Sequence, residues 1–241
     1  MNLFTITDLT KEYGEGGAKV VALKKINLII PKEKFIVILG ASGSGKSTLI
    51  NMLGCLDRPT GGRIKFLDTD ITAFNKRQMT AFRGEHIGFV FQSYNLLPDL
   101  TALENVEFST ELALRRRQAT FLPRTEAETA LGLVGLAERM DHYPAQLSGG
   151  EQQRVSIARA IAKNPGVLLC DEPTGALDFN TGVMVLDVLK QIHKNKKSSI
   201  LLITHNQEIA KIADIIITLR SGEIAGMEEN TKPLSPMEVV W

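Results

Sequence analysis

Eight consecutive residues, Gly40–Ser47 (GASGSGKS), fit the pattern G-x-x-x-x-G-K-[ST] without a mismatch. An apolar run, Phe35–Leu39, precedes them and a segment of helical pattern, Lys46–Leu53, follows, which is the context that this pattern requires. Glycines let successive backbone N–H groups turn toward phosphate oxygens, and the helix adds the positive end of its dipole. The lysine then supplies a cation for the terminal phosphates, and the serine hydroxyl is a ligand for Mg²⁺. We therefore predict a nucleotide-binding site formed by Gly40, Ser42, Gly43, Ser44, Gly45, Lys46, Ser47 and Thr48.

Two adjacent carboxylates follow a second apolar run. Val167–Cys170 has the composition of a buried strand and is followed at once by Asp171 and Glu172. Neighbouring side chains of a strand point in opposite directions, so the two acids are expected to have different functions. We expect Asp171 to hold Mg²⁺ through its water shell and Glu172 to accept a proton from the attacking water or polarise it. Acids at a strand end can also be mere solubilising groups, but the phosphate-binding segment upstream favours the catalytic interpretation.

The elements that position these residues alternate between strands and helices. The first third contains strand-like segments such as Leu3–Leu9 and Val20–Ile30, and the last third returns to an alternation of apolar strands and amphipathic helices. This order predicts an α/β fold with a mostly parallel sheet. Between them, about Leu96 to Tyr143, the residues predict a helical insertion in which Asp99 or Thr101 caps one helix and Thr125 caps the next.

Length and composition set limits on the class of protein. The chain has 241 residues, 44% hydrophobic and 23% charged, which suits one substantial domain of ordinary globular composition. A formal net charge of +1 gives no reason to expect a nucleic-acid partner. No apolar stretch approaches the roughly 20 residues of a membrane-spanning helix, and the start lacks a signal-peptide pattern. Cys55 and Cys170 are far apart in apolar surroundings and are predicted to be buried small hydrophobes.

A third motif narrows the possibilities. Leu147–Glu151 (LSGGE), which we call the signature segment, precedes an amphipathic helix and resembles the signature of ABC ATPases. The order of motifs along the chain is also similar to that family: Gln92 after a strand, Gly175–Asp178 like the D-loop, and His205 like the switch histidine. Tyr13, expected in a loop between the first two strands, resembles the aromatic residue that stacks on adenine. The resemblance covers essentially the whole chain.

The resemblance implies a P-loop NTPase core with a mostly parallel sheet, an N-terminal antiparallel β region and a helical subdomain. The implied boundaries are a single ABC ATPase domain over residues 1–228 and a C-terminal tail over 229–241. Within the domain, 1–91 and 148–228 form the α/β core and 92–147 the helical subdomain.

The resemblance also implies how the residues work. Two cassettes pair head to tail, and each ATP, with Mg²⁺, lies between the phosphate-binding segment of one and the signature segment of the other. Glu172 is then the general base, Gln92 contacts Mg²⁺ and the attacking water, and His205 holds the γ-phosphate. Asp178 couples the two sites of the dimer. The residues implied to touch ATP from the opposite cassette are Ser148, Gly149 and Gly150.

In this family such a cassette drives a separate membrane permease, which implies a homodimer on the cytoplasmic face of the inner or plasma membrane. The stretch Tyr94–Thr101 with Glu104–Val106 resembles the segment that docks on the permease. Several stretches are similar to the macrolide-export, lipoprotein-release and antimicrobial-peptide-resistance branch: Asn51–Gly54 with Leu56–Gly62, Phe91–Pro98, and the tail ending in Trp241. The cargo and the permease are not readable from the chain, because substrate contacts lie in the partner.

Three other kinds of ABC protein remain as alternatives. A DNA-repair or chromosome ATPase needs a long coiled coil between its motifs, and no sustained heptads occur here. A translation factor normally carries two cassettes, and Arg115–Arg117 is better explained as a solvated helix face than as a ribosome contact. A cassette that binds ATP without hydrolysing it is disfavoured because Lys46, Asp171, Glu172 and His205 are all present.

Overall fold

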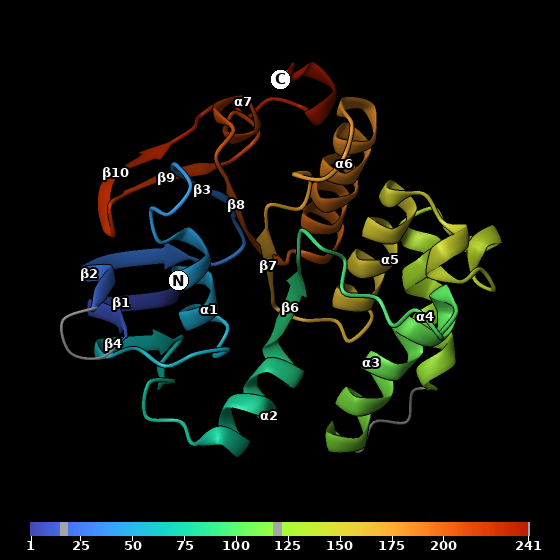
Figure 1. Ribbon diagram of the computed structural model, residues 1–241, viewed down its shortest axis with the longest axis horizontal. Coiled ribbons are helices and arrows are strands. Elements are labelled where there is room, and N and C mark those ends of the chain that lie inside the picture. The colour runs from blue at the N-terminus through green and yellow to red at the C-terminus, as the bar shows by residue number, and fades with distance from the viewer. Residues whose placement is uncertain (15–18, 118–121, 241) are drawn as a thin grey trace. The chain divides into compact units, whose positions relative to one another are not determined.

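The computed structural model describes residues 1–14, 19–117 and 122–240, with the side chains of 112–117 outside the description. The predicted solvated face at Arg115–Arg117 and the tail residue Trp241 therefore lie outside the described residues. The chain forms two compact units (Figure 1). The first comprises residues 1–83, 201–234 and 239–241, and the second comprises 84–200 and 235–238. The predicted helical subdomain, 92–147, falls wholly within the second unit.

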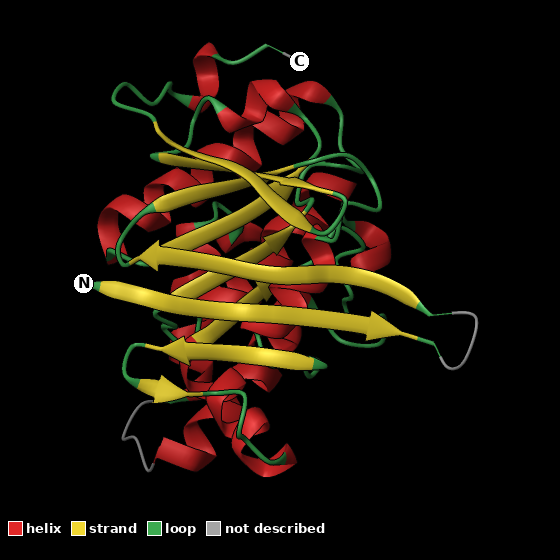
Figure 2. Ribbon diagram, turned by 90° about the vertical axis from the view of Figure 1, so that its left-hand side faces the viewer, coloured by secondary structure: helices red, strands yellow, loops and turns green. Residues whose placement is uncertain are grey.

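An antiparallel sheet forms the N-terminal part of the first unit, as expected from its alternating apolar residues. Its strand order is β2-β1-β4-β5, and the long pair β1 and β2 is prominent in Figure 2. Phe4 and Ile6, and then Leu9 and Lys11, are buried at a spacing of two, and the pattern changes phase between them at an irregularity of the strand that includes Asp8, whose φ is 47°. The strand bounds are β1 Asn2–Tyr13, β2 Val20–Pro31, β4 Gly61–Phe66 and β5 Thr69–Asp70.

A second group of strands in the first unit positions the phosphate-binding segment. Strand β3 (Phe35–Leu39) pairs in parallel with β9 (Ile215–Arg220), and β10 (Glu223–Glu229) pairs antiparallel with β9. Strand β8 (Ser199–Thr204), which brings the chain back from the second unit, is the other neighbour of β3. The first four residues of β3 are fully buried, as a continuous apolar run predicts for a strand covered on both faces. The helices of this unit are α1 Lys46–Leu53 and α7 Gln207–Ala210, and α2 Lys76–His86 leads out of it.

In the second unit, strands β6 (Ile87–Val90) and β7 (Val167–Asp171) pair in parallel. Helix α5 (Gly149–Ile161) packs against β6, and helix α6 (Phe179–Lys196) packs against α5. The buried face of α5 includes the Val155, Ala158 and Ile161 pattern seen in the sequence. These elements place the signature segment and the paired acids in one unit.

Helices α3 (Ala102–Arg117) and α4 (Pro123–Leu133) pack on each other and on α5, as the labels in Figure 1 show. Thr101 caps α3: Thr101 Oγ1 accepts from Glu104 N at 3.2 Å, and Thr101 N donates to Glu104 Oε2 at 2.8 Å. The predicted cap at Thr125 is wrong. Helix α4 begins two residues earlier with Pro123 at its first position, which needs no N–H partner, so Thr125 lies inside the helix.

Short 3₁₀ turns complete the second unit at Ala137–Arg139, Pro144–Gln146 and Pro236–Glu238, the last packed on α6. No helix among the described residues is both long enough and apolar enough to span a membrane. Cys55 and Cys170 are buried free thiols, as predicted. Burial raises the pKa of the Cys55 thiol to about 11, so it stays protonated at neutral pH.

Candidate active site

The phosphate-binding segment turns sharply between β3 and α1 in the first unit. Gly45 has a φ of 103°, and a Cβ there would lie 2.6 Å from the carbonyl oxygen of Ala22, so only glycine fits. The carbonyl oxygen of Ser44 accepts a hydrogen bond from Gly222 N at 3.0 Å, which ties the segment to the turn between β9 and β10. The segment therefore lies tightly between Ala22 of β2 and the turn that joins β9 to β10.

Lys46 and Ser44 show that this segment fits a phosphate chain. The Lys46 ammonium group is buried and donates to the carbonyl oxygens of Gly40 at 2.8 Å and Ala41 at 2.9 Å. Within the described part of the chain, the buried Ser44 Oγ has no hydrogen-bond partner. A buried hydroxyl without a partner is costly, and phosphate oxygens supply the missing one. Of the other predicted contacts, Ser42, Gly43 and Ser47 are exposed, and Thr48 and Gly40 are partly buried.

A backbone hydrogen bond places His205 close to the phosphate-binding segment. Gly40 N donates to the carbonyl oxygen of Thr204 at 3.3 Å, and Thr204 immediately precedes His205 at the end of β8. His205 itself is exposed. The structure thus brings the predicted switch histidine and the predicted phosphate site to the same end of two neighbouring strands.

Tyr13 is the last residue of β1 rather than a loop residue, so the predicted position between the first two strands is wrong. The strand continues through Lys11, whose ammonium group is buried and pairs with Asp57 at 2.7 Å. Tyr13 Oη donates to Asp57 Oδ2 at 3.2 Å, and Lys11 Nζ lies 4.7 Å from the centre of the Tyr13 ring. Burial alone would raise the pKa of the Asp57 carboxyl, but hydrogen bonds from Lys11, Arg58 N and Tyr13 hold it below its ordinary value. The ring is therefore fixed by a charged pair while 40% of Tyr13 stays exposed.

In the second unit, Asp171 ends β7 and Glu172 leaves the strand. Glu172 has a φ of 45°, in the left-handed region that non-glycine residues seldom adopt. We predicted from strand alternation that the two acidic side chains point in opposite directions. Because Glu172 does not have extended backbone geometry, alternation does not determine the direction of its side chain. A sharp backbone turn separates the two carboxylates instead, and both are partly buried.

Gln92 lies beside the turn that follows these acids. A Cβ at Gly175 would lie 2.7 Å from Gln92 Nε2, and Gly175 N donates to the carbonyl oxygen of Glu172 at 3.0 Å. The buried Gln153 of α5 donates from Nε2 to the carbonyl oxygen of Phe91 at 3.3 Å, just before Gln92. The structure thus brings Gln92, Glu172 and Gly175 together and connects them to the helix of the signature segment.

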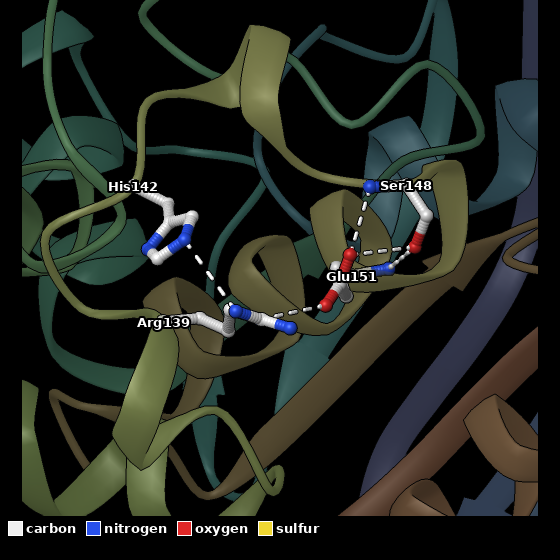
Figure 3. A network of polar contacts seen from close by, with 4 residues as sticks. All are labelled: Arg139, His142, Ser148 and Glu151. Carbon is white, nitrogen blue, oxygen red and sulfur yellow. Dashed lines mark hydrogen bonds and ion pairs between the residues drawn. The ribbon is translucent and has the colours of Figure 1, made fainter.

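The signature segment begins α5 with a capping box (Figure 3). Ser148 Oγ accepts from Glu151 N at 3.3 Å, while Ser148 N and Ser148 Oγ both donate to Glu151 Oε2 at 2.8 Å. On its other side Glu151 Oε1 accepts from Arg139 Nε at 3.2 Å. Hydrogen bonds from Ser148 N and Ser148 Oγ, followed by the Arg139 charge, hold the pKa of Glu151 below its ordinary value. A carboxylate therefore occupies the positive end of α5.

Asp178 and Thr181 connect the D-loop to the same place. Asp178 caps α6, with Oδ1 accepting from Thr181 N at 3.1 Å and Oδ2 from Thr181 Oγ1 at 2.6 Å. These two hydrogen bonds hold the pKa of the exposed Asp178 below its ordinary value. Gly150 packs directly on Thr181, and Gly149 lies beside the hydroxyl of Tyr94. The starts of α5 and α6 are thus in contact.

Comparison with known proteins decides the family. A family model described as "ABC transporter" matches residues 23–175, which is more than half of the chain. The chain belongs to the ABC transporter family.

Relatives of this family match along most of the chain. An uncharacterised ABC transporter ATP-binding protein of Methanocaldococcus jannaschii is 46% identical, over 89% of this chain and 94% of that protein. The lipoprotein-releasing system ATP-binding protein LolD of Geobacter metallireducens is 43% identical, over 92% of this chain and 98% of that protein. The macrolide export ATP-binding/permease protein MacB of Pectobacterium atrosepticum is 43% identical over 96% of this chain, which spans 35% of that protein.

Solved ABC cassettes have the same fold. The dimeric ATP-binding cassette MJ0796, in a post-hydrolysis state with ADP and Pi, has a TM-score of 0.86 and 39% identity, covering 95% of this chain and 99% of that one. The predicted α/β ABC ATPase fold is confirmed. The protein is accordingly an ATP-binding cassette and an ATPase.

Several residues of this ABC cassette that contact the site were given no role from the sequence. Glu151 had a local signal, because serine followed three residues later by glutamate is the capping-box pattern. Arg139 and Thr181 had none, since their partners in the signature segment are distant in sequence. Lys11 and Asp57 likewise meet only through the fold.

Proposed function

We propose that this chain is the ATP-hydrolysing subunit of an ABC transporter, which pairs head to tail with a second copy and drives a separate integral-membrane permease for export or force transmission. The match along nearly the whole length of LolD, named as the ATP-binding protein of a lipoprotein-releasing system, carries this proposal. MacB, whose name joins an ATP-binding part and a permease part, is matched over about a third of its length. Such a subunit would lie in the cytoplasm, peripheral to the inner or plasma membrane through its permease.

The residues of the first unit would bind the nucleotide. The Lys46 ammonium group would exchange the carbonyl oxygens of Gly40 and Ala41 for the β- and γ-phosphates, and Ser44 Oγ would gain its missing partner. His205 would hold the γ-phosphate, and Tyr13 would stack on adenine. Mg²⁺, which neutralises phosphate charge, would take the Ser47 hydroxyl as its ligand in this unit; Gln92 and Asp171, which the resemblance implies as further ligands, belong to the second unit.

The residues of the second unit would carry out hydrolysis and pairing. Glu172 would take the proton of the attacking water, which Gln92 would help to orient. Ser148, Gly149 and Gly150 would contact the γ-phosphate bound to the second copy, and Asp178 would couple the two sites. Binding energy gained across the interface would be lost when the γ-phosphate is released, so the pair would open after hydrolysis.

The permease would dock on the segment Tyr94–Thr101, which the structure holds firmly. The buried Asn105 of α3 accepts from Leu97 N at 2.8 Å and donates to three carbonyl oxygens of this segment at 2.9–3.0 Å. Arg159 of α5 donates to the carbonyl oxygens of Tyr94 and Asn95. A movement of the signature helix would therefore be passed to this segment.

The test is purification of the Glu172→Gln variant from detergent-solubilised membranes of the host, with ATP and Mg²⁺. We expect a polytopic membrane protein to co-purify, and to be lost in the matched control that carries Lys46→Ala as well. Recovery of ribosomes or nucleic acid in place of a membrane protein would overturn the transport assignment and favour a non-transport ABC ATPase. In the same variant, ATP turnover at the rate of the parent would overturn the general-base assignment of Glu172.

A further inference from the structure

Figure 3 shows a cluster of polar side chains at the start of α5, formed by Arg139, His142, Ser148 and Glu151. Within it, the Glu151 carboxylate lies between Ser148 and Arg139. Its Oε2 atom takes both hydrogen-bond donors of Ser148, the backbone N–H and the hydroxyl, at 2.8 Å each. Its Oε1 atom faces the Arg139 guanidinium group at 3.2 Å. The carboxylate therefore holds the serine whose hydroxyl is proposed to meet the γ-phosphate.

An incoming phosphate would meet this carboxylate at the same helix end. The start of α5 attracts one anion, and Glu151 already fills that position in the described structure. A second anion placed beside it would be repelled unless a positive charge compensates the first. The Ser148 hydroxyl also has a single proton to donate, so Glu151 and the phosphate would compete for it.

Arg139 is placed to compensate this charge. Its guanidinium group comes from the 3₁₀ turn Ala137–Arg139, and it also contacts His142, with Arg139 Nη1 3.5 Å from His142 Nε2. Half of the Arg139 side chain is exposed, so the ion pair contributes little to the stability of the unit by itself. Closure of the dimer would exclude water from the Arg139–Glu151 ion pair. With less screening by solvent, the attraction between the two charges would then be much stronger than in the isolated chain.

We propose that Arg139 is a positioning residue for ATP-driven pairing: it compensates and draws aside the Glu151 carboxylate, so that the Ser148 hydroxyl can donate its hydrogen bond to the γ-phosphate bound by a second copy of this chain. This rests on the proposed function of Ser148 in the head-to-tail dimer. Arg139 acts through Glu151 and need not touch the nucleotide.

The test uses dimer formation with ATP, measured by light scattering on the full chain in the Glu172→Gln background. Arg139→Ala should raise the dimer dissociation constant about tenfold, equivalent to about 1.4 kcal/mol. Glu151→Gln should pair more tightly than the background, because glutamine keeps the capping box without the charge. When Glu151→Gln is already present, adding Arg139→Ala should raise the dimer dissociation constant only about twofold.

Two controls separate this effect from a structural one. Arg124→Ala removes a more exposed ion pair, Arg124–Glu128 on α4 at 3.0 Å, and should pair like the background. ATP affinity of the monomer, which depends on the phosphate-binding segment, should be the same in Arg139→Ala as in the background.

The proposal is overturned if Arg139→Ala pairs like the background, or if Glu151→Gln fails to restore pairing to it. Absence of ATP-dependent pairing in the Glu172→Gln background itself would instead remove the proposed dimer function, and this inference with it.

Discussion

Gly150 of the signature segment lies directly against Thr181 of α6, so that a side chain at position 150 would overlap the Thr181 methyl group. Thr181 is in turn held by Asp178, the residue implied to couple the two ATP sites. The signature segment and the D-loop therefore touch within one unit. A shift of one must displace the other, because both begin helices whose first turns are in contact.

Gly150→Ala should accordingly destabilise the chain by about 1–3 kcal/mol, the usual cost of overpacking. The second change Thr181→Ser removes the methyl group and keeps the hydroxyl that bonds to Asp178, so it should recover most of this loss. Urea unfolding of the two variants and of Thr181→Ser alone measures the effect. Equal destabilisation of the single and double variants would show that the backbone of Gly150, not its contact with Thr181, is limiting.

Lys46→Ala should lose ATP affinity. The buried ammonium group lies within the phosphate-binding segment, where it donates to the carbonyl oxygens of Gly40 and Ala41. Titration calorimetry should show binding weakened by about two orders of magnitude, in keeping with the loss of a charge-assisted contact worth about 3 kcal/mol. Lys34→Ala, at an exposed position of the same unit, is the matched control and should bind ATP like the parent. Unchanged ATP binding in Lys46→Ala would refute the phosphate role.

Tyr13 offers a test of base recognition that is independent of the phosphates. Tyr13→Leu removes the ring and should weaken ATP binding by about 1–3 kcal/mol, the range for one stacked base. Tyr13→Phe keeps the ring and loses only the hydrogen bond to Asp57, so its loss should be about 1 kcal/mol or less. Binding of inorganic triphosphate should be equal in all three proteins. A matching loss for triphosphate would show that Tyr13 shapes the phosphate site and does not contact the base.

The sequence predicted elements best where one segment carried its own signal. The bounds of α1 and β3 agree with the prediction, because a continuous apolar run, a glycine-rich turn and a helix start follow one another. The extension of β1 to Tyr13 was missed because its buried polar residue, Lys11, is stabilised by Asp57, far away in sequence. Thr125 was chosen as a cap because its side chain suits one, whereas proline at the first helical position was sufficient to begin α4.

The motifs of the site could be predicted from the sequence, but the positions of their side chains relative to one another could not. The left-handed φ of Glu172 has no signature in residue type, so strand alternation gave the wrong reason for separating the two acids. Arg139 and Glu151 are twelve residues apart with two turns between them, a spacing that no local rule connects. Such contacts are set by packing of separate elements, which pattern alone does not contain.

Asn105 gives the last prediction, which concerns the segment proposed to meet the permease. Its side chain is 1% exposed and binds one N–H and three carbonyl oxygens between Leu97 and Thr101. Asn105→Ala removes these four side-chain hydrogen bonds at once, while the carbonyl oxygens of Leu97 and Thr101 keep their backbone donors, and it should lower the free energy of unfolding by about 2–3 kcal/mol. Asn105→Asp should cost more, because it keeps the acceptor for Leu97 N but turns a carboxylate oxygen toward three carbonyl oxygens.

Urea unfolding measures both Asn105 variants, with Asn195→Ala, at an exposed position of α6, as the control expected to match the parent. ATP-driven pairing of Asn105→Ala, measured below its unfolding midpoint, should be retained, because the residue holds the segment 97–101 and not the signature segment. Co-purification of the permease should fall, since the docking segment loses its fixed shape. If Asp were tolerated as well as Ala, the amide donors of Asn105 would not be what fixes this segment, and its proposed role in holding the docking segment would have to be abandoned.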